Sequence, residues 1–319
     1  MKLKRIRRRL GFHLLRSLAA WRASGGMQAV ADAGERLGRW HYRLAQKQRI
    51  DLEHQLVKLF ELPADDQRPT RWLKTSYRLN DRAILEILAM YSGRTSIAEV
   101  AAHCDLDRLP VLDQALEENQ GVVLLGWHMG NGVAMATRLA HLGYPVSVVY
   151  RESNKIQPDF YRNGLTLMGL DAIGAQPPAT GFRRMLKALK DNRIIYILMD
   201  QGIKHGVDTA FLGKRVPMPP GPAELVRRTG CALLSAPLIN VEPRWRFGFE
   251  RLETLNPAEP LETSIEKLSS IMETQILESP EWWTWHQRRW PRYPFLEPQQ
   301  QNSALQLSTK RFEQAKEDL

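Results

Sequence analysis

Short apolar runs alternate with stretches of helical periodicity through the middle of the chain. The runs are GVVLLGW at 121–127, YPVSVVY at 144–150 and RIIYILMD at 193–200, with a weaker one at 170–174. Helix-like stretches lie between them, at 133–142, 157–168 and 181–190. A strand buried on both faces has a continuous apolar sequence, and strands alternating with helices favour a parallel sheet. The sequence therefore predicts an α/β fold with a mostly parallel central sheet flanked by helices.

Further helical and strand patterns lie on both sides of this region. We expect helices at 27–60, 70–94, 112–118, 221–228 and 261–278, and strands at 231–241 and 245–252. Pro63 and Pro69 separate the first two helical stretches. These patterns predict a single α/β domain over residues 26–296, with a helical N-terminal part up to about residue 110, and a polar tail at 297–319.

Composition indicates a globular protein and excludes a disulfide-rich or Cys-rich zinc protein. Hydrophobic residues make up 43% and charged residues 25% of the 319 residues, as in globular proteins. Cys104 and Cys231 are too few for a disulfide framework or a Cys-rich zinc site. No apolar run approaches the roughly 18 residues of a membrane-spanning helix, and no secretory signal is recognisable. We therefore expect no membrane-spanning helix, and we expect neither a cofactor nor a metal ion.

The first 22 residues form a basic amphipathic pattern. They contain eight Lys or Arg residues and no acid, which leaves a net charge of +2 on the rest of a chain whose total is +10. The apolar residues at helical spacing are Leu3, Ile6, Leu10, Leu14, Leu18 and Trp21. A basic helix of this kind, within residues 1–25, is typical of a segment on an anionic membrane surface. A solvated basic helix packed on the domain is the alternative, and the nearly neutral body disfavours nucleic acid as a partner.

A histidine follows the first buried strand in the sequence W-H-M-G-N-G. In open α/β sheets, ligands bind beyond the carboxyl ends of the strands, where His128 is expected to lie. We expect the neighbouring glycines to let a substrate approach the backbone. A histidine there can take a proton from a hydroxyl group and make it a nucleophile. Taken by itself, the position favours a structural histidine over a catalytic one.

The buried strand at 193–200 delivers a carboxylate, Asp200, at its carboxyl end. If the two strands are neighbours, Asp200 and His128 meet in one cleft, and the carboxylate fixes the tautomer of the imidazole. Capping of the next loop, or pairing with a lysine, is the alternative for Asp200. Gly221 precedes a helix and leaves backbone N–H groups for an anion or an oxyanion, or simply forms a turn.

Taken together, these motifs resemble the bacterial lipid A biosynthesis lauroyl/myristoyl acyltransferases, within the lysophospholipid acyltransferase superfamily. The resemblance covers roughly residues 10–295. Its motifs are G-W-H-M-G-N at 126–131, V-V-Y-R-x-x-N-K at 148–155, the pair Asp200-Gln201, F-L-G-K-R-V-P-M-P-P-G-P-A at 211–223 and P-E-W-W-T-W-H-Q-R-R-W at 280–290.

The resemblance implies a glycerolipid-acyltransferase-like fold and a membrane-associated acyltransferase. Such an enzyme moves a fatty acyl group from acyl carrier protein, or acyl-CoA, to a hydroxyl or amine of a membrane lipid such as lipid A, a glycolipid or an aminolipid. It also implies peripheral binding at the cytoplasmic face of the bacterial inner membrane. We expect His128 as general base with Asp200 as its catalytic partner. The expected substrate-binding residues are Asn131, Arg151, Gln201, Phe211, Gly213, Gly221, Arg288 and Arg289.

One position departs from the family pattern. The family has an acid five positions after the histidine, and this chain has Val133 there. Either Asp200 replaces that acid, or the chain is a weak or inactive member that still binds lipid or acyl carrier protein. We predict a hydrogen bond between Asp200 and His128, direct or through one water, and a supporting role for the aromatic stretch 280–290.

Overall fold

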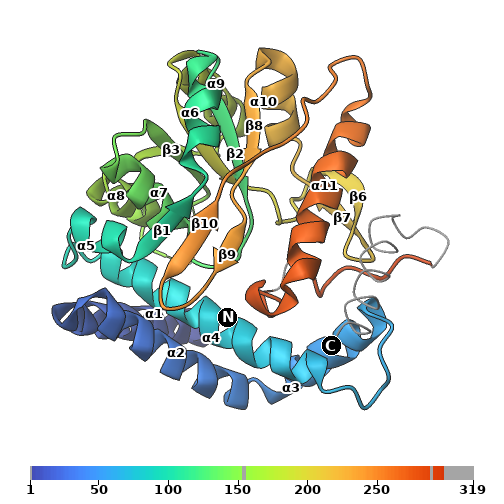
Figure 1. Ribbon diagram of the computed structural model, residues 1–319. Coiled ribbons are helices and arrows are strands. Elements are labelled where there is room, and N and C mark those ends of the chain that lie inside the picture. The colour runs from blue at the N-terminus through green and yellow to red at the C-terminus, as the bar shows by residue number, and fades with distance from the viewer. Residues whose placement is uncertain (1, 153–155, 288–289, 298–319) are drawn as a thin grey trace.

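The computed structural model describes residues 2–152, 156–287 and 290–297. Within them, a six-stranded sheet has the order β11-β8-β2-β5-β3-β4 (Figure 1). Its strands are Glu250–Arg251, Ala232–Ser235, Val122–Gly126, Ile194–Leu198, Val146–Tyr150 and Asp171–Gly174, in that order. All neighbours pair in parallel except β11, which is antiparallel to β8. The predicted α/β fold with a mostly parallel sheet is confirmed.

Strand β2 lies inside the sheet because its sequence is apolar throughout, and every residue of it is buried. The helices of the α/β part are α6 (Leu109–Glu117), α7 (Gly132–His141), α8 (Phe160–Leu167), α9 (Pro178–Lys190), α10 (Gly221–Thr229) and α11 (Leu261–Glu278). Asn131 caps the N-terminus of α7, because its side chain accepts a hydrogen bond from the backbone N–H of Ala134. This cap ends the loop that contains His128.

An N-terminal layer of helices packs along one side of the α/β part, at the bottom of Figure 1. Its members are α1 (Lys2–Arg22), α2 (Gly26–Leu44), α3 (Gln46–Leu59) and α4 (Arg68–Met90), and the short α5 (Ile97–Ala102) follows them and packs against α7. Helix α4 is buried along much of its length and lies between α2 and the rest of the molecule. The predicted N-terminal helical region is confirmed, although residues 27–60 form two helices rather than one.

Two stretches that the sequence predicts as single strands, 231–241 and 245–252, are each divided into two strands. Strand β8 ends at Ser235, and β9 (Leu238–Asn240) joins a separate three-stranded sheet of order β1-β10-β9. The second stretch divides in the same way, between β10 (Trp245–Gly248) and β11. The reason is a partner distant in sequence, because β1 (Cys104–Asp107) pairs with β10.

One further pair of strands was not predicted from the sequence. Residues Val207–Phe211 and Lys214–Met218 form an antiparallel hairpin, β6 and β7, with Gly213 at a positive φ in its turn. The hairpin packs against α11.

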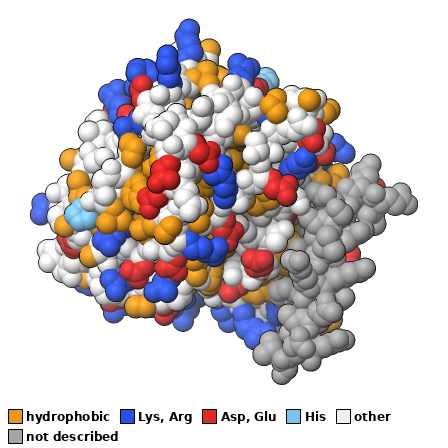
Figure 2. Space-filling model, turned by 45° about the horizontal axis from the view of Figure 1, so that its top comes forward, with side chains coloured by type: hydrophobic (Ala, Val, Ile, Leu, Met, Phe, Trp, Pro, Cys, Tyr) orange, Lys and Arg blue, Asp and Glu red, His pale blue; other side chains and the backbone are white. Residues whose placement is uncertain are grey.

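Charge on the body of the protein is mixed. Figure 2 shows acidic, basic and hydrophobic side chains interspersed on the face that it presents. Among the described residues, no helix combines the length and apolar character needed to cross a bilayer. The expected tail at 297–319 lies almost wholly outside the described residues, which end at Glu297.

Candidate active site

The carboxyl ends of β2 and β5 place His128 beside Asp200. The two strands pair in parallel, with Gly126 opposite Leu198. Because His128 lies two residues after Gly126 and Asp200 two residues after Leu198, both follow their strands at the same edge of the sheet. His128 Nδ1 lies 2.6 Å from Asp200 Oδ1, and the backbone N–H of His128 donates to Asp200 Oδ2 at 2.8 Å. The predicted pairing is confirmed.

This contact fixes the tautomer of His128. An ionised carboxylate only accepts hydrogen bonds, so Nδ1 holds the ring proton and Nε2 is the acceptor nitrogen of the ring. The Asp200 residue is only 3% exposed, whereas the side chain of His128 is 18% exposed. The histidine is thus the partner that an incoming molecule can reach.

Trp283 also donates to Asp200. Its indole Nε1 lies 2.8 Å from Asp200 Oδ2. Trp283 is itself held by Ser76 of α4, whose hydroxyl donates to the Trp283 carbonyl oxygen, and by edge-on contacts with Phe211 and Trp285. A supporting role for the stretch 280–290 was predicted from the sequence, and this bond is a specific instance of it.

Gln201 contacts the other side of the His128 ring. Its Nε2 lies 2.9 Å from His128 Nε2, which accepts from the amide in the tautomer set by Asp200. A molecule that binds at His128 Nε2 must therefore displace this amide or share the lone pair with it.

The glycines around His128 have a different role from the expected one. A Cβ atom on Gly132 would lie 2.0 Å from the hydroxyl oxygen of Tyr196, and one on Gly126 would lie 2.6 Å from it. Tyr196 comes from β5 and is buried, and burial raises its pKa. These two glycines make room for a protein side chain rather than for a substrate.

Asn131 lies next to the site but is fully buried. Besides capping α7, its amide nitrogen donates to Glu86 of α4 at 2.9 Å. Both ends of the amide are used inside the protein, so the structure gives Asn131 a structural role, and its contact with a substrate stays a prediction.

Glu86 is a buried hub that the sequence analysis missed. It pairs with Arg82 at 2.9 Å and His103 at 3.3 Å, and it accepts from the Trp245 indole at 2.6 Å. Burial by itself raises the pKa of Glu86, but His103, Arg82 and Asn131 together outweigh burial and lower it. The sequence signal was a group of charged residues, Asp81, Arg82 and Glu86, in an otherwise apolar part of α4. Such a group resembles ordinary surface pairing along a helix.

The other expected binding residues are spread over several elements. Arg151 follows β3 and is exposed. Phe211 and Gly213 are buried at the turn of the β6–β7 hairpin. Gly221 begins α10 with open space around it, but Pro222 lacks an N–H and Glu224 places an acid in the first turn. Arg288 and Arg289 lie outside the described residues, and the binding roles of all these residues stay predictions.

A cavity of ≈ 300 Å³ opens beside the His128 loop. Trp127 and Met129, the neighbours of His128, line it, together with Leu238. Glu250 and Glu278 add carboxylates, which can accept hydrogen bonds from hydroxyl or amine groups. The cavity thus lies close to the candidate base and combines apolar and acidic surface.

Comparison with known proteins gives a consistent assignment. The family model described as bacterial lipid A biosynthesis acyltransferase matches residues 4–292. A phosphatidylinositol mannoside acyltransferase of Mycolicibacterium smegmatis is 30% identical over 166 residues, which are 50% of this chain and 51% of that protein. Two proteins of the same description from Mycobacterium tuberculosis are 29% identical over 131 residues, about 40% of each chain. The chain spans about half the length of the curated relatives it matches, or less.

Proposed function

The chain belongs to the family of bacterial lipid A biosynthesis acyltransferases, and from this membership we propose an active enzyme that acylates a membrane lipid. The donor is a thioester, acyl carrier protein or acyl-CoA. The acceptor is a hydroxyl or amine of a lipid such as lipid A, a glycolipid or an aminolipid. The name of the mycobacterial relatives supports a glycolipid within this range.

His128 is the general base of this reaction. Its Nε2 takes the proton from the acceptor hydroxyl while the hydroxyl oxygen attacks the thioester carbonyl carbon. The tetrahedral intermediate then expels the thiolate, which receives that proton from the imidazolium. The bond to Asp200 supports this role, because a nearby carboxylate stabilises the imidazolium and holds the productive tautomer.

The position of Asp200 is the observation on which the proposal depends. Val133 cannot orient a histidine, and it lies on α7, where it packs against the hydrophobic core. Asp200 supplies a carboxylate from the neighbouring strand instead. The alternative is a weak or inactive member that only binds lipid or carrier protein, and Val133 is the feature that favours it.

Binding at the membrane surface is proposed for the N-terminal helices. Leu10, Leu14 and Trp21 are 58%, 62% and 66% exposed on α1, at spacings that place them along one side. Trp40 and Leu44 on α2 are 59% and 80% exposed. Arginines lie against both tryptophans, Arg22 on Trp21 and Arg43 on Trp40. Exposed Trp and Leu beside basic residues are typical of helices on an anionic bilayer, here the cytoplasmic face of the inner membrane.

The test uses the full-length protein in vesicles that contain anionic lipid and a mixture of lipid acceptors. Labelled acyl carrier protein and acyl-CoA are supplied separately, and lipid products are identified by mass spectrometry. We expect acyl transfer from one donor, and His128→Ala should lower the rate by about 10²–10⁴-fold. His141→Ala, an exposed histidine at the end of α7, is the control. Absence of transfer with every donor and acceptor would instead support the inactive alternative.

A further inference from the structure

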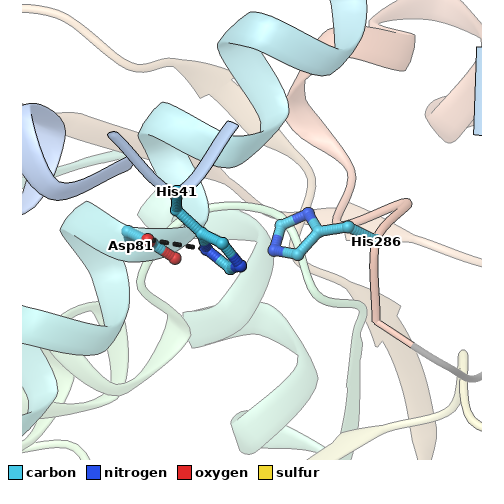
Figure 3. A group of neighbouring side chains, drawn as sticks. All are labelled: His41, Asp81 and His286. Carbon is cyan, nitrogen blue, oxygen red and sulfur yellow. Dashed lines mark hydrogen bonds and ion pairs between the residues drawn. The ribbon is translucent and has the colours of Figure 1, made fainter. Parts of the chain in front are cut away.

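Three side chains from distant parts of the chain meet away from the His128 site. His41 comes from α2, Asp81 from α4 and His286 from the aromatic stretch 280–290 (Figure 3). Each offers one possible ligand atom, and these atoms all lie within 4.8 Å of one another. His41 Nδ1 lies 3.0 Å from Asp81 Oδ2. In Figure 3 the ring of His286 lies beside the ring of His41, and the two planes are nearly perpendicular.

The ring of His286 is buried, and among the described residues it has no hydrogen-bond partner. It is 7% exposed, and among the described residues neither Nδ1 nor Nε2 has a partner. A buried polar group without a partner is unfavourable by about 1–3 kcal/mol, so its retention calls for an explanation. The two ring nitrogens are therefore potential ligand atoms, because imidazole is a common metal ligand.

Neighbouring side chains hold His286 and Asp81 in place. Tyr77 stacks on the His286 ring with centroids 4.0 Å apart and planes 24° from parallel. Asn80 donates to Asp81 Oδ1 at 2.8 Å and accepts from Gln287 at 3.0 Å. Metal ligands are commonly oriented by such outer contacts. The His41 side chain is 42% exposed and therefore has room to adjust.

We propose that His41, Asp81 and His286 bind one divalent transition-metal ion, with Zn²⁺ as the best fit. Two imidazoles and a carboxylate are ligands that zinc prefers, whereas Mg²⁺ and Ca²⁺ prefer oxygen alone. Tetrahedral zinc with Zn–N near 2.1 Å separates its ligand atoms by about 3.4 Å, so small side-chain rotations complete the site. The exposed side of His41 leaves the fourth position to water. No metal was expected from the sequence, in which His41, Asp81 and His286 lie far apart.

The ion fastens the stretch 280–290 to the helical layer. That stretch contains Trp283, which donates to Asp200. The ion itself takes no part in proton transfer, and its role is to hold the C-terminal stretch that supports the Asp200 carboxylate. The inference is independent of the acyl-transfer proposal, because metal binding is measured without any acyl donor.

The direct test is metal binding by the full-length protein. The protein is stripped with a chelator, dialysed, and titrated with Co²⁺ and then Zn²⁺, with metal content measured by mass spectrometry. We expect one equivalent of metal per chain, visible d–d absorption of four-coordinate Co²⁺, and loss of that absorption when Zn²⁺ is added. A wild-type protein that binds no stoichiometric metal would overturn the proposal and leave a simple His41–Asp81 ion pair.

Two variants and a control locate the metal. His41→Ala changes a half-exposed side chain and should fold normally, and His286→Ala tests the buried ligand. Each should weaken zinc binding at least 100-fold and abolish the rise in melting temperature that zinc gives the wild type. His54→Ala removes an exposed histidine of α3 and should bind metal like the wild type. Equal binding by wild type and His41→Ala would place the metal elsewhere and overturn the assignment.

Discussion

At the scale of single residues, Asp200 is the central group. Its carboxylate receives the His128 ring N–H, the His128 backbone N–H and the Trp283 indole N–H, each at 2.6–2.8 Å. Hydrogen bonds to an ionised acceptor are stronger than those between neutral groups. The contacts keep the carboxylate in one orientation towards the imidazole.

We expect Asp200→Asn to lower turnover on the scale of His128→Ala, with folding retained. An asparagine can present its amide to Nδ1 in place of an acceptor, which favours the wrong tautomer, and it does not stabilise the imidazolium. The double variant should lose little more than either single one, because residues that act as a unit are not additive. Turnover of all three variants, with circular dichroism to check folding, measures this. Additive losses would contradict a single working pair.

At the scale of elements, a buried hydrogen bond connects α11 to the β6–β7 hairpin. Glu273 of α11 is fully buried and accepts a hydrogen bond from the backbone N–H of Leu212 in the hairpin turn. Burial raises the pKa of Glu273 to about 8, although the Leu212 bond opposes that rise. The carboxyl group is therefore protonated in the folded protein near neutral pH.

This pKa predicts a pH dependence that Glu273→Gln removes. Between the usual value of 4.5 and about 8, the unfolded chain loses the proton and the folded protein keeps it. The folded state then binds more protons, so wild-type stability falls as pH rises, by up to about 1.4 kcal/mol per pH unit. Denaturant unfolding between pH 4.5 and about 8 should show the free energy of unfolding of Glu273→Gln rising relative to that of the wild type as pH increases. Glu266→Gln, an exposed change on the same helix, should show no such gain.

The exposed stripe on α1 consists of Leu10, Leu14 and Trp21. It is separate from the face by which α1 packs. Ala19 is fully buried, and Phe12 contacts Phe160 of α8 edge-on, with ring centroids 5.2 Å apart. Deleting the whole helix would uncover this packed face. A point substitution on the stripe is therefore the cleaner test of membrane binding.

We expect Leu14→Glu to weaken binding to anionic vesicles at least tenfold while the fold is kept, because Leu14 is 62% exposed and a charge there opposes insertion. Cosedimentation with vesicles of stated lipid composition measures the effect. Gln28→Glu adds the same charge at an exposed position of α2 outside the stripe and is the matched control. Equal loss for both variants would indicate a general charge effect and argue against the stripe.

At the scale of the whole molecule, Glu86 connects the helical layer to the start of α7 and to the three-stranded sheet. It bonds to Asn131 at the start of α7 and to Trp245 of β10, as well as to Arg82 on its own helix. A buried ion pair becomes unfavourable when one partner loses its charge, because the other remains buried and uncompensated.

Glu86→Gln should therefore destabilise the protein by about 3 kcal/mol, near the lower end for a broken buried pair. Chemical unfolding at neutral pH measures this, with the exposed change Glu117→Gln as control. A loss no larger than that of the control would mean that Glu86 is a replaceable polar residue.

Much of the α/β part could be predicted from local sequence. Strands β2, β3 and β5 follow their apolar runs within a few residues, because a strand buried on both faces needs an apolar side chain at nearly every position. The contact of His128 with Asp200 was also predictable, because parallel strands end at the same edge of a sheet. Because Val133 stands where the family has an acid, that contact tested whether Asp200 supplies a carboxylate to His128 in its place.

The remaining features depend on partners that local periodicity does not identify. The stretch 231–241 divides between two sheets because β9 pairs with β10, and β10 in turn pairs with β1 far earlier in the chain. Asn131 is a cap and a partner of Glu86 because α4 lies beside it. The sequence by itself determined the central sheet, its flanking helices and the candidate base with its carboxylate, since those follow from side-chain patterns and strand direction. Only tertiary packing decided the Glu86 hub, the Trp283 bond to Asp200 and the meeting of His41, Asp81 and His286, since each joins segments far apart in the chain.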